Sequence, residues 1–199
     1  MVLKNLNKLN IKKNILIFVF IFASFFSQSF EISKANEKVV IKVFSSLTCP
    51  HCANFHQKVV INLKNDYLNK NLVKFEHHSF PLDMAALNAE KILRCIENSE
   101  KKFEFLSIIY KKQEKWAVGS DINIINDSIK KIGKEVGLKD KRMDKCLSNE
   151  KIQDEILNER IEAQKNYKIS STPTVYINKK KYEGKHEYKV FKKELDKLL

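Results

Sequence analysis

Two cysteines separated by two residues, in Cys49-Pro50-His51-Cys52, are the residues of this 199-residue chain whose types and spacing most directly suggest chemistry. Such a pair can close a small disulfide and open it again. We expect Cys49 at the N-terminus of a helix, where unpaired N–H groups and the helix dipole favour the thiolate. Pro50 needs no N–H donor in a first helical turn, and His51 can add positive charge or a donor beside the Cys49 sulfur. A stabilised thiolate is a good leaving group, so these residues favour passing a disulfide to another protein.

Zinc binding is the alternative use of such a cysteine pair. His56, His77 and His78 could complete a zinc site with Cys49 and Cys52. The chain has no second CxxC motif, and a strand pattern directly precedes the first one. We therefore expect no metal, with His56 a surface or packing residue. His77 and His78 are expected to be satisfied or solvated at a strand end.

The residues around the motif predict a β-α-β unit. Residues 39–44 are β-branched and aromatic, which is typical of a strand buried on both faces. A helical pattern then runs from the motif to about residue 64. Its apolar positions recur every fourth residue, at Phe55, Val59 and Leu63. A second strand is predicted over 72–77, and residues 36–80 form the first part of a parallel-sheet domain.

Residues 81–149 change in character and predict helices without a strand. Pro81 and Asp83 open the first helix, and Gly137 ends the third. The remaining helices are predicted over 103–116, over 122–132 and from an N-cap at Asp140. We interpret this stretch as a helical domain inserted into the sheet domain.

Residues 150–199 predict the return to that sheet domain. The pattern predicts a helix over 152–167 and a strand over 174–177. A hairpin turn into a short strand follows over 178–182, and a closing helix over 188–199. The predicted fold class is therefore α/β, with the helical domain inserted between its two parts.

The first 35 residues have the pattern of a secretory signal peptide. Its basic end is formed by Lys4, Lys8, Lys12 and Lys13. An apolar core at 15–26 follows, and small residues then offer cleavage after Ala35, with Ser29 as the second choice. An uncleaved anchor and a buried core helix are the alternatives. Export would place the cysteines in an oxidising compartment, for which we expect the periplasm.

The net charge of +13 first suggests nucleic acid as a partner. Removing residues 1–35 takes away five lysines and one glutamate, which leaves +9. Most remaining lysines stand beside glutamates or on the polar side of a helical pattern, as on a solvated surface. With no recognition motif and an export signal, we expect no nucleic-acid partner. Attraction to acidic clients or anionic surfaces stays open.

The motif Cys49-Pro50-His51-Cys52 after a strand, the inserted helices, and Thr172-Pro173 before a later strand together resemble one known family. This part of the chain, about residues 39–199, is similar to the DsbA-like thiol:disulfide oxidoreductases of the thioredoxin superfamily. The resemblance implies a thioredoxin-like fold, with Cys49 and Cys52 as the redox disulfide and His51 and Pro50 tuning it. It implies no cofactor.

The resemblance also implies a cis peptide bond before Pro173, beside the two cysteines. Thr172 would then offer backbone groups to an extended client peptide, with its hydroxyl near the sulfurs. A trans proline at the start of an edge strand is the alternative. Similar proteins often carry an acid six positions before the first cysteine, where this chain has Val43. How Cys52 exchanges its proton therefore stays open.

Cys95 and Cys146 both lie in the helical domain, 51 positions apart, on helices expected to pack together. In an oxidising compartment we expect them to form a structural disulfide, a pairing that some similar proteins share. Free buried thiols and a second redox pair are the alternatives.

Three functions follow as hypotheses. The first is a monomeric dithiol oxidase that introduces disulfides into reduced exported proteins and is itself reoxidised by a quinone-linked membrane partner, as the family implies. The second is an isomerase or reductase of the same fold, disfavoured because no dimerisation segment precedes the domain. The third is a thiol-bearing periplasmic binding or chaperone module.

Overall fold

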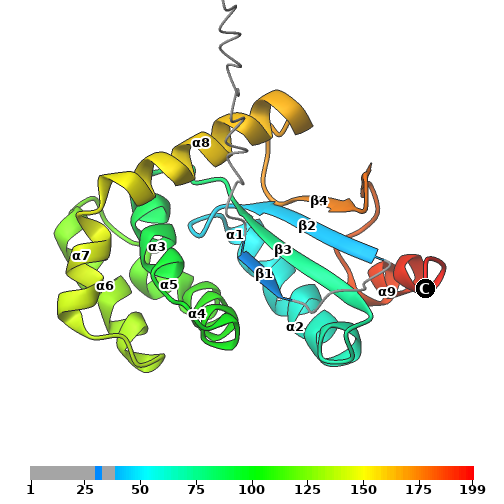
Figure 1. Cartoon of the computed structure of the whole chain (residues 1–199), viewed down its shortest axis with the longest axis horizontal. Coiled ribbons are helices and arrows are strands. Elements are labelled where there is room, and N and C mark those ends of the chain that lie inside the picture. The colour runs from blue at the N-terminus through cyan, green and yellow to red at the C-terminus, as the bar shows by residue number, and fades with distance from the viewer. Residues whose placement is uncertain (1–29, 33–38) are drawn as a thin grey trace, which may run out of the picture.

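The sheet of this protein is built from strands far apart in the sequence. The structure, a computed structural model, describes residues 30–32 and 39–199, so most of the predicted signal peptide lies outside the described residues. Within them, five strands form one sheet in the order β1-β3-β2-β4-β5 (Figure 1). The strands are β1 (Phe30–Ile32), β2 (Val39–Ser45), β3 (Val73–Ser79), β4 (Thr174–Ile177) and β5 (Lys180–Lys181). Among the described strands, β2 and β3 alone pair in parallel, as expected for the two strands of a β-α-β unit.

The central strand β2 delivers the chain to the cysteine motif. Val39, Ile41 and Val43 are buried, as the β-branched run predicts. Burial on both faces was expected for the whole strand, but Val40 and Lys42 are only half-buried. Strand β3 extends to Ser79, two residues beyond the prediction. That extension brings its last residues level with Ser45, the last residue of β2.

The helical segment after the motif is continuous from residue 50 to residue 68 but alternates between α and π geometry. It comprises α1 (Pro50–Phe55), the π-helical η1 (His56–Val60), α2 (Ile61–Leu63) and the π-helical η2 (Lys64–Leu68). The apolar residues at spacing four are all buried. They anchor this segment on the sheet, together with α9 (Tyr188–Asp196), which packs against α2 and η1.

The inserted helices gather at one end of the sheet (Figure 1). They are α3 (Met84–Arg94), α4 (Ser99–Lys111), α5 (Gln113–Trp116), α6 (Ile122–Glu135) and α7 (Asp140–Leu147). Asp83 caps α3 by accepting a hydrogen bond from the Ala86 N–H at 2.7 Å. The single helix predicted over 103–116 is instead split into α4 and α5. Asp140 is the first residue of α7 rather than its N-cap, which is Lys139.

Helix α8 (Glu150–Tyr167) joins the helical group to the sheet, since it packs against both α3 and β3 (Figure 1). Buried charges mark this junction: Glu159 of α8 pairs with Arg94 of α3 and, at 3.0 Å, with His78 of β3. The α/β fold class with an inserted helical domain is confirmed.

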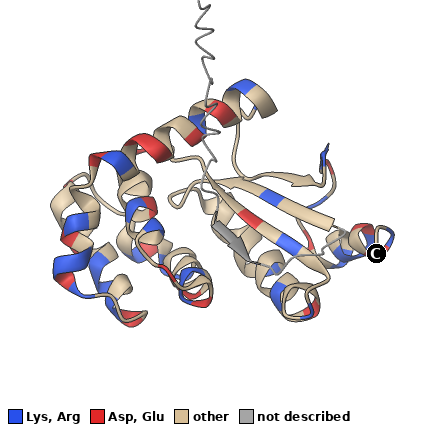
Figure 2. Cartoon of the chain, viewed as in Figure 1, with Lys and Arg blue, Asp and Glu red and all other residues tan. Residues whose placement is uncertain are grey.

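The positive charge of the chain is distributed rather than gathered. Figure 2 shows Lys and Arg interleaved with Asp and Glu along most helices. Pairs such as Lys112 with Glu135, at 2.6 Å, and Lys134 with Asp140, at 2.8 Å, fit the expectation of a solvated surface. In the part of the chain that the structure describes, none of the helices combines the length and apolar character needed to cross a bilayer.

Candidate active site

Cys49 lies where β2 ends and α1 begins. It is the N-cap of α1, with extended backbone angles, and Pro50 occupies the first helical position. The turn before it is closed by the Cys49 N–H, which donates to the Ser46 carbonyl at 3.1 Å. Cys49 is 7% exposed and Cys52 is 2% exposed, and both are free thiols. The strand-to-helix junction thus holds one slightly exposed cysteine and a second that is more deeply buried.

The Thr172–Pro173 peptide bond is cis and lies beside these thiols. The Cys49 sulfur lies 3.4 Å from the Thr172 carbonyl oxygen, to which it donates when it is protonated. The Thr172 hydroxyl oxygen is buried and, among the described residues, has no hydrogen-bond partner. The backbone of β4 therefore begins against the sulfurs, where an extended peptide can be held next to Cys49.

The surroundings of the two thiols pull their pKa values in opposite directions. A hydrogen bond from Cys52 outweighs burial and, with smaller contributions from Thr172 and backbone N–H groups, lowers the pKa of Cys49 to about 5. Burial raises the pKa of Cys52 well above its usual value. His51 is exposed and contributes through its backbone amide. At neutral pH Cys49 is therefore a thiolate nucleophile, while Cys52 keeps its proton.

Helix α5 holds the loop before Cys49 in place, which the sequence did not indicate. The Gln113 side-chain amide donates to the Leu47 carbonyl at 2.7 Å and to the Cys49 carbonyl at 3.1 Å. On the other side of the loop, the Thr48 hydroxyl donates to Asp83 at 2.6 Å. The helical domain thus fixes the backbone that carries the nucleophile. No signal in the sequence marked this residue, because the burial of Gln113 is visible only in the structure.

The three histidines considered as zinc ligands are engaged elsewhere. His56 lies 3.0 Å from the Ser107 hydroxyl, and His77 lies 2.8 Å from Glu90. His78 contacts Glu159 and Glu76, at 3.0 and 3.1 Å. Within residues 39–199, no three His, Cys, Asp or Glu side chains are grouped so as to hold a metal ion.

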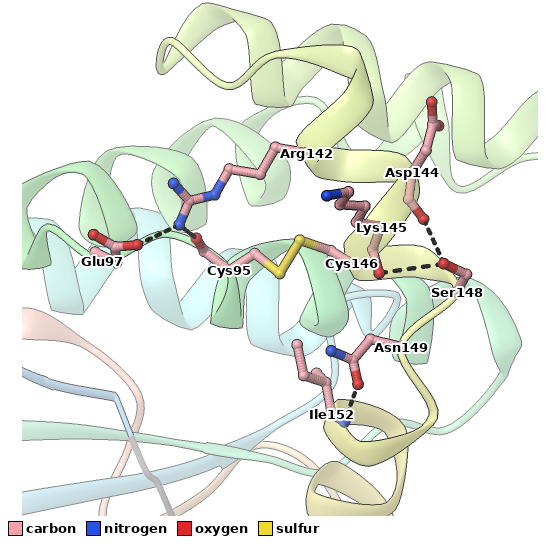
Figure 3. Close-up of a disulfide and its surroundings, with 9 residues drawn as sticks. All are labelled: Cys95, Glu97, Arg142, Asp144, Lys145, Cys146, Ser148, Asn149 and Ile152. Atoms are coloured by element: carbon pink, nitrogen blue, oxygen red, sulfur yellow. Dashed lines mark hydrogen bonds and ion pairs between the residues drawn. A yellow bond between two sulfur atoms is a disulfide. The ribbon is translucent and has the colours of Figure 1, made fainter.

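Cys95 and Cys146 form a disulfide that joins the end of α3 to α7 (Figure 3). Their Cα atoms are 6.2 Å apart. Arg142 covers this bridge, because its guanidinium donates to the Cys95 carbonyl at 2.6 Å and pairs with Glu97 at 2.7 Å. The disulfide lies in the helical domain, so it is separate from the thiols of the CxxC motif.

A strand-to-helix CxxC pair that faces a cis-proline, on a sheet flanked by helices, defines a thioredoxin-fold protein with a redox centre of two cysteines. The sequence profile of the thioredoxin family matches residues 30–197. The chain belongs to this family, as one of its DsbA-like thiol:disulfide oxidoreductases.

Individual relatives agree with this assignment. α-DsbA1 of Wolbachia pipientis superposes with a TM-score of 0.78 at 26% identity, covering 86% of this chain and 90% of that one. A protein-disulfide oxidoreductase of Rickettsia bellii is 29% identical over 74% of this chain and 56% of its own length. Disulfide bond formation protein D of Bacillus subtilis is 24% identical over 84% of this chain and 76% of its own length. The chain thus spans little more than half of the Rickettsia relative.

Proposed function

We propose that this protein is an exported dithiol oxidase that introduces disulfides into reduced client proteins. The observation that carries the proposal is the split between its two thiols: Cys49 ionises near pH 5, and Cys52 is buried and stays protonated. The stabilised Cys49 thiolate favours the reduced pair, which makes the Cys49–Cys52 disulfide easy to reduce. A disulfide that is easily reduced is readily transferred to the thiols of a client protein.

The exchange then proceeds in two steps. A client thiolate attacks Cys49, the Cys49–Cys52 bond breaks, and Cys52 leaves with the electron pair. The second client thiolate then attacks the client sulfur of the mixed disulfide, and the bond from that sulfur to Cys49 breaks. Cys49 leaves as a thiolate, which releases an oxidised client and a reduced enzyme. The cis Thr172–Pro173 bond beside Cys49 supports the proposal, because backbone groups at this place can pair with an extended client segment.

The reduction potential of the Cys49–Cys52 pair tests the direction of exchange. At pH 7, a Cys49 pKa of about 5 stabilises the reduced form about a hundredfold over an ordinary thiol, which corresponds to roughly 60 mV. We expect a potential clearly more oxidising than the glutathione couple, measured in glutathione buffers with mass spectrometry of trapped thiols. The Cys95–Cys146 bridge serves as an internal structural control. A potential as reducing as that of cytosolic thioredoxin would instead support the reductase or isomerase.

The oxidase needs an acceptor for the electrons it collects. Two thiols become a disulfide again only when another disulfide or oxidant takes two electrons, and a quinone-linked membrane protein is the partner the family suggests. Reduced exported proteins are the proposed substrates, and the periplasm is the proposed location. We propose that the enzyme acts as a monomer without a cofactor.

Strand β1 bears on where the signal peptide is removed. Its residues pair with β3, Phe30 with His77 and Ile32 with Phe75, so cleavage after Ala35 would remove a sheet strand. Cleavage after Ser29 would keep it, and we propose that site instead. N-terminal sequencing of the protein exported by a bacterial host is expected to begin at Phe30; a chain that begins at Asn36 contradicts the proposal.

A further inference from the structure

A small cavity lies directly under the buried thiol of Cys52. About 10 Å³ of it is open to the centre of a water molecule, at the lower limit of the space that can hold one water molecule. Its polar lining comprises Cys52, Ser45, His56, His77 and Tyr110. These residues offer the two to four polar partners that a buried water needs, so the cavity suits one water molecule.

Any exchange at this site requires Cys52 to gain or lose a proton. When Cys52 attacks a mixed disulfide on Cys49, its thiol proton must leave, and when it is displaced, its thiolate must be neutralised. Burial makes an unneutralised thiolate costly there. Bulk water has little access, because the side chain is 2% exposed. A nearby buried group is needed to exchange this proton.

Two of the groups facing the cavity cannot take that role. Burial lowers the pKa of His56 to about 3, so the ring is neutral at working pH and does not hold a second proton. Burial raises the pKa of Tyr110 well above its usual value, so the phenol keeps its proton. Val43 also lines the cavity, but it has no group that accepts a proton.

His77 is the cavity group that remains, and it is backed by a carboxylate. Its Nδ1 lies 3.2 Å from the Ser45 hydroxyl, on the cavity side. Its Nε2 lies 2.8 Å from Glu90, which is fully buried and also accepts a hydrogen bond from the Ser79 hydroxyl at 2.9 Å. A carboxylate in this position orients the imidazole, so that Nδ1 faces Ser45 while Nε2 faces Glu90.

The register of the sheet explains why this histidine reaches the site. His77 on β3 stands beside Val43 on β2, and Ser79 stands beside Ser45. Glu90 approaches from α3 of the helical group. The sheet and the inserted domain thus each supply one member of the pair.

The geometry points to the His77–Glu90 pair as the proton acceptor and donor for Cys52, acting through Ser45 and one water in the cavity. The inference rests on the proposed thiol exchange at this site. During resolution, the Cys52 proton passes to His77 Nδ1, the Cys52 sulfur bonds to Cys49, and the bond from Cys49 to the client sulfur breaks. The client leaves as a thiolate and takes a proton from solvent. The reverse step returns the His77 proton to Cys52.

Stopped-flow oxidation of the reduced protein separates the reaction of Cys49 from the reaction of Cys52 in time. An aromatic bis(nitrothiobenzoate) disulfide releases one coloured thiolate when Cys49 attacks it and a second when Cys52 resolves the mixed disulfide. With Glu90→Gln or His77→Phe we expect the second phase at pH 6 to slow by roughly a hundredfold. Its rate should then rise about tenfold per pH unit, because hydroxide must remove the proton. In the wild type the second phase should lack this tenfold rise per pH unit.

Glu159→Gln is the matched control, because Glu159 is also a buried carboxylate bonded to a histidine of β3, but its partner His78 does not line the cavity. It should leave both phases unchanged, and the first phase should be unchanged in every variant. If Glu90→Gln fails to fold, Ser45→Ala removes one bridging hydroxyl and should also slow the second phase selectively. A wild-type second phase and pH profile in the folded variants would overturn the inference. The reagent oxidises any accessible dithiol, so this result is independent of whether the protein proves to be an oxidase.

Discussion

Replacing Cys49 with serine is expected to lower the rate of disulfide transfer to a reduced client by at least about a thousandfold, the scale on which removing a nucleophile acts in other enzymes. The reason lies in the ionisation of this thiol. Cys49 is a thiolate at neutral pH because a hydrogen bond from Cys52 lowers its pKa to about 5. A serine hydroxyl at the same N-cap remains protonated and forms no disulfide. The rate at which a reduced, denatured client recovers its activity, followed by the fluorescence of the client, measures the loss of disulfide transfer.

Replacing Cys52 instead separates attack from resolution. Cys52→Ser keeps a hydroxyl that can donate to the Cys49 thiolate, so alkylation of Cys49 should still reach half its maximal rate near pH 5. With no second sulfur, mixed disulfides between Cys49 and clients should accumulate and be visible by mass spectrometry. If a client still folds normally with the Cys49→Ser variant, the enzyme hypothesis is contradicted. The binding-module hypothesis is then favoured, because that function does not need this thiol.

The chemistry of the motif could be predicted because it is local. A strand, a CxxC pair and a proline at the first helical position are adjacent in the sequence, and they suffice to place Cys49 at a helix N-terminus. Nothing local indicates that Gln113, 64 residues later, holds the Cys49 carbonyl. That contact depends on how the inserted helices pack on the sheet, which periodicity does not fix.

The histidines of β3 also show that contacts between distant residues could not be predicted from the sequence. His77 and His78 are consecutive on β3, so they point to opposite faces of the sheet. One meets Glu90 of α3 and the other meets Glu159 of α8, 13 and 81 positions away. A sequence shows two adjacent histidines, but only the strand register and the two helices reveal that each is buried against its own carboxylate. Buried charges are recognised by their partners, and these partners are distant in the chain.

Removing the Cys95–Cys146 bridge is expected to have the largest effect on stability. The bridge closes a loop of 51 positions, and the loop-entropy relation assigns such a closure about 4 kcal/mol, mainly by restricting the unfolded chain. For a domain of this size, the double variant Cys95→Ala with Cys146→Ala should melt roughly 8–16 °C lower. Thermal unfolding followed by circular dichroism, with the CxxC thiols kept reduced, measures the difference.

The double variant is the informative one, because a single substitution leaves a free thiol that could pair with Cys49. Cys146 is only 4% exposed, so alanine also avoids leaving a hydroxyl without a partner in the core. Alkylation of Cys49 should keep its profile near pH 5, since the groups that set it lie on α1 and before β4. A melting temperature within about 2 °C of the wild type would show that the bridge restricts the unfolded chain far less than its length implies. A shifted Cys49 profile would mean that the helical domain transmits the loss to the loop held by Gln113.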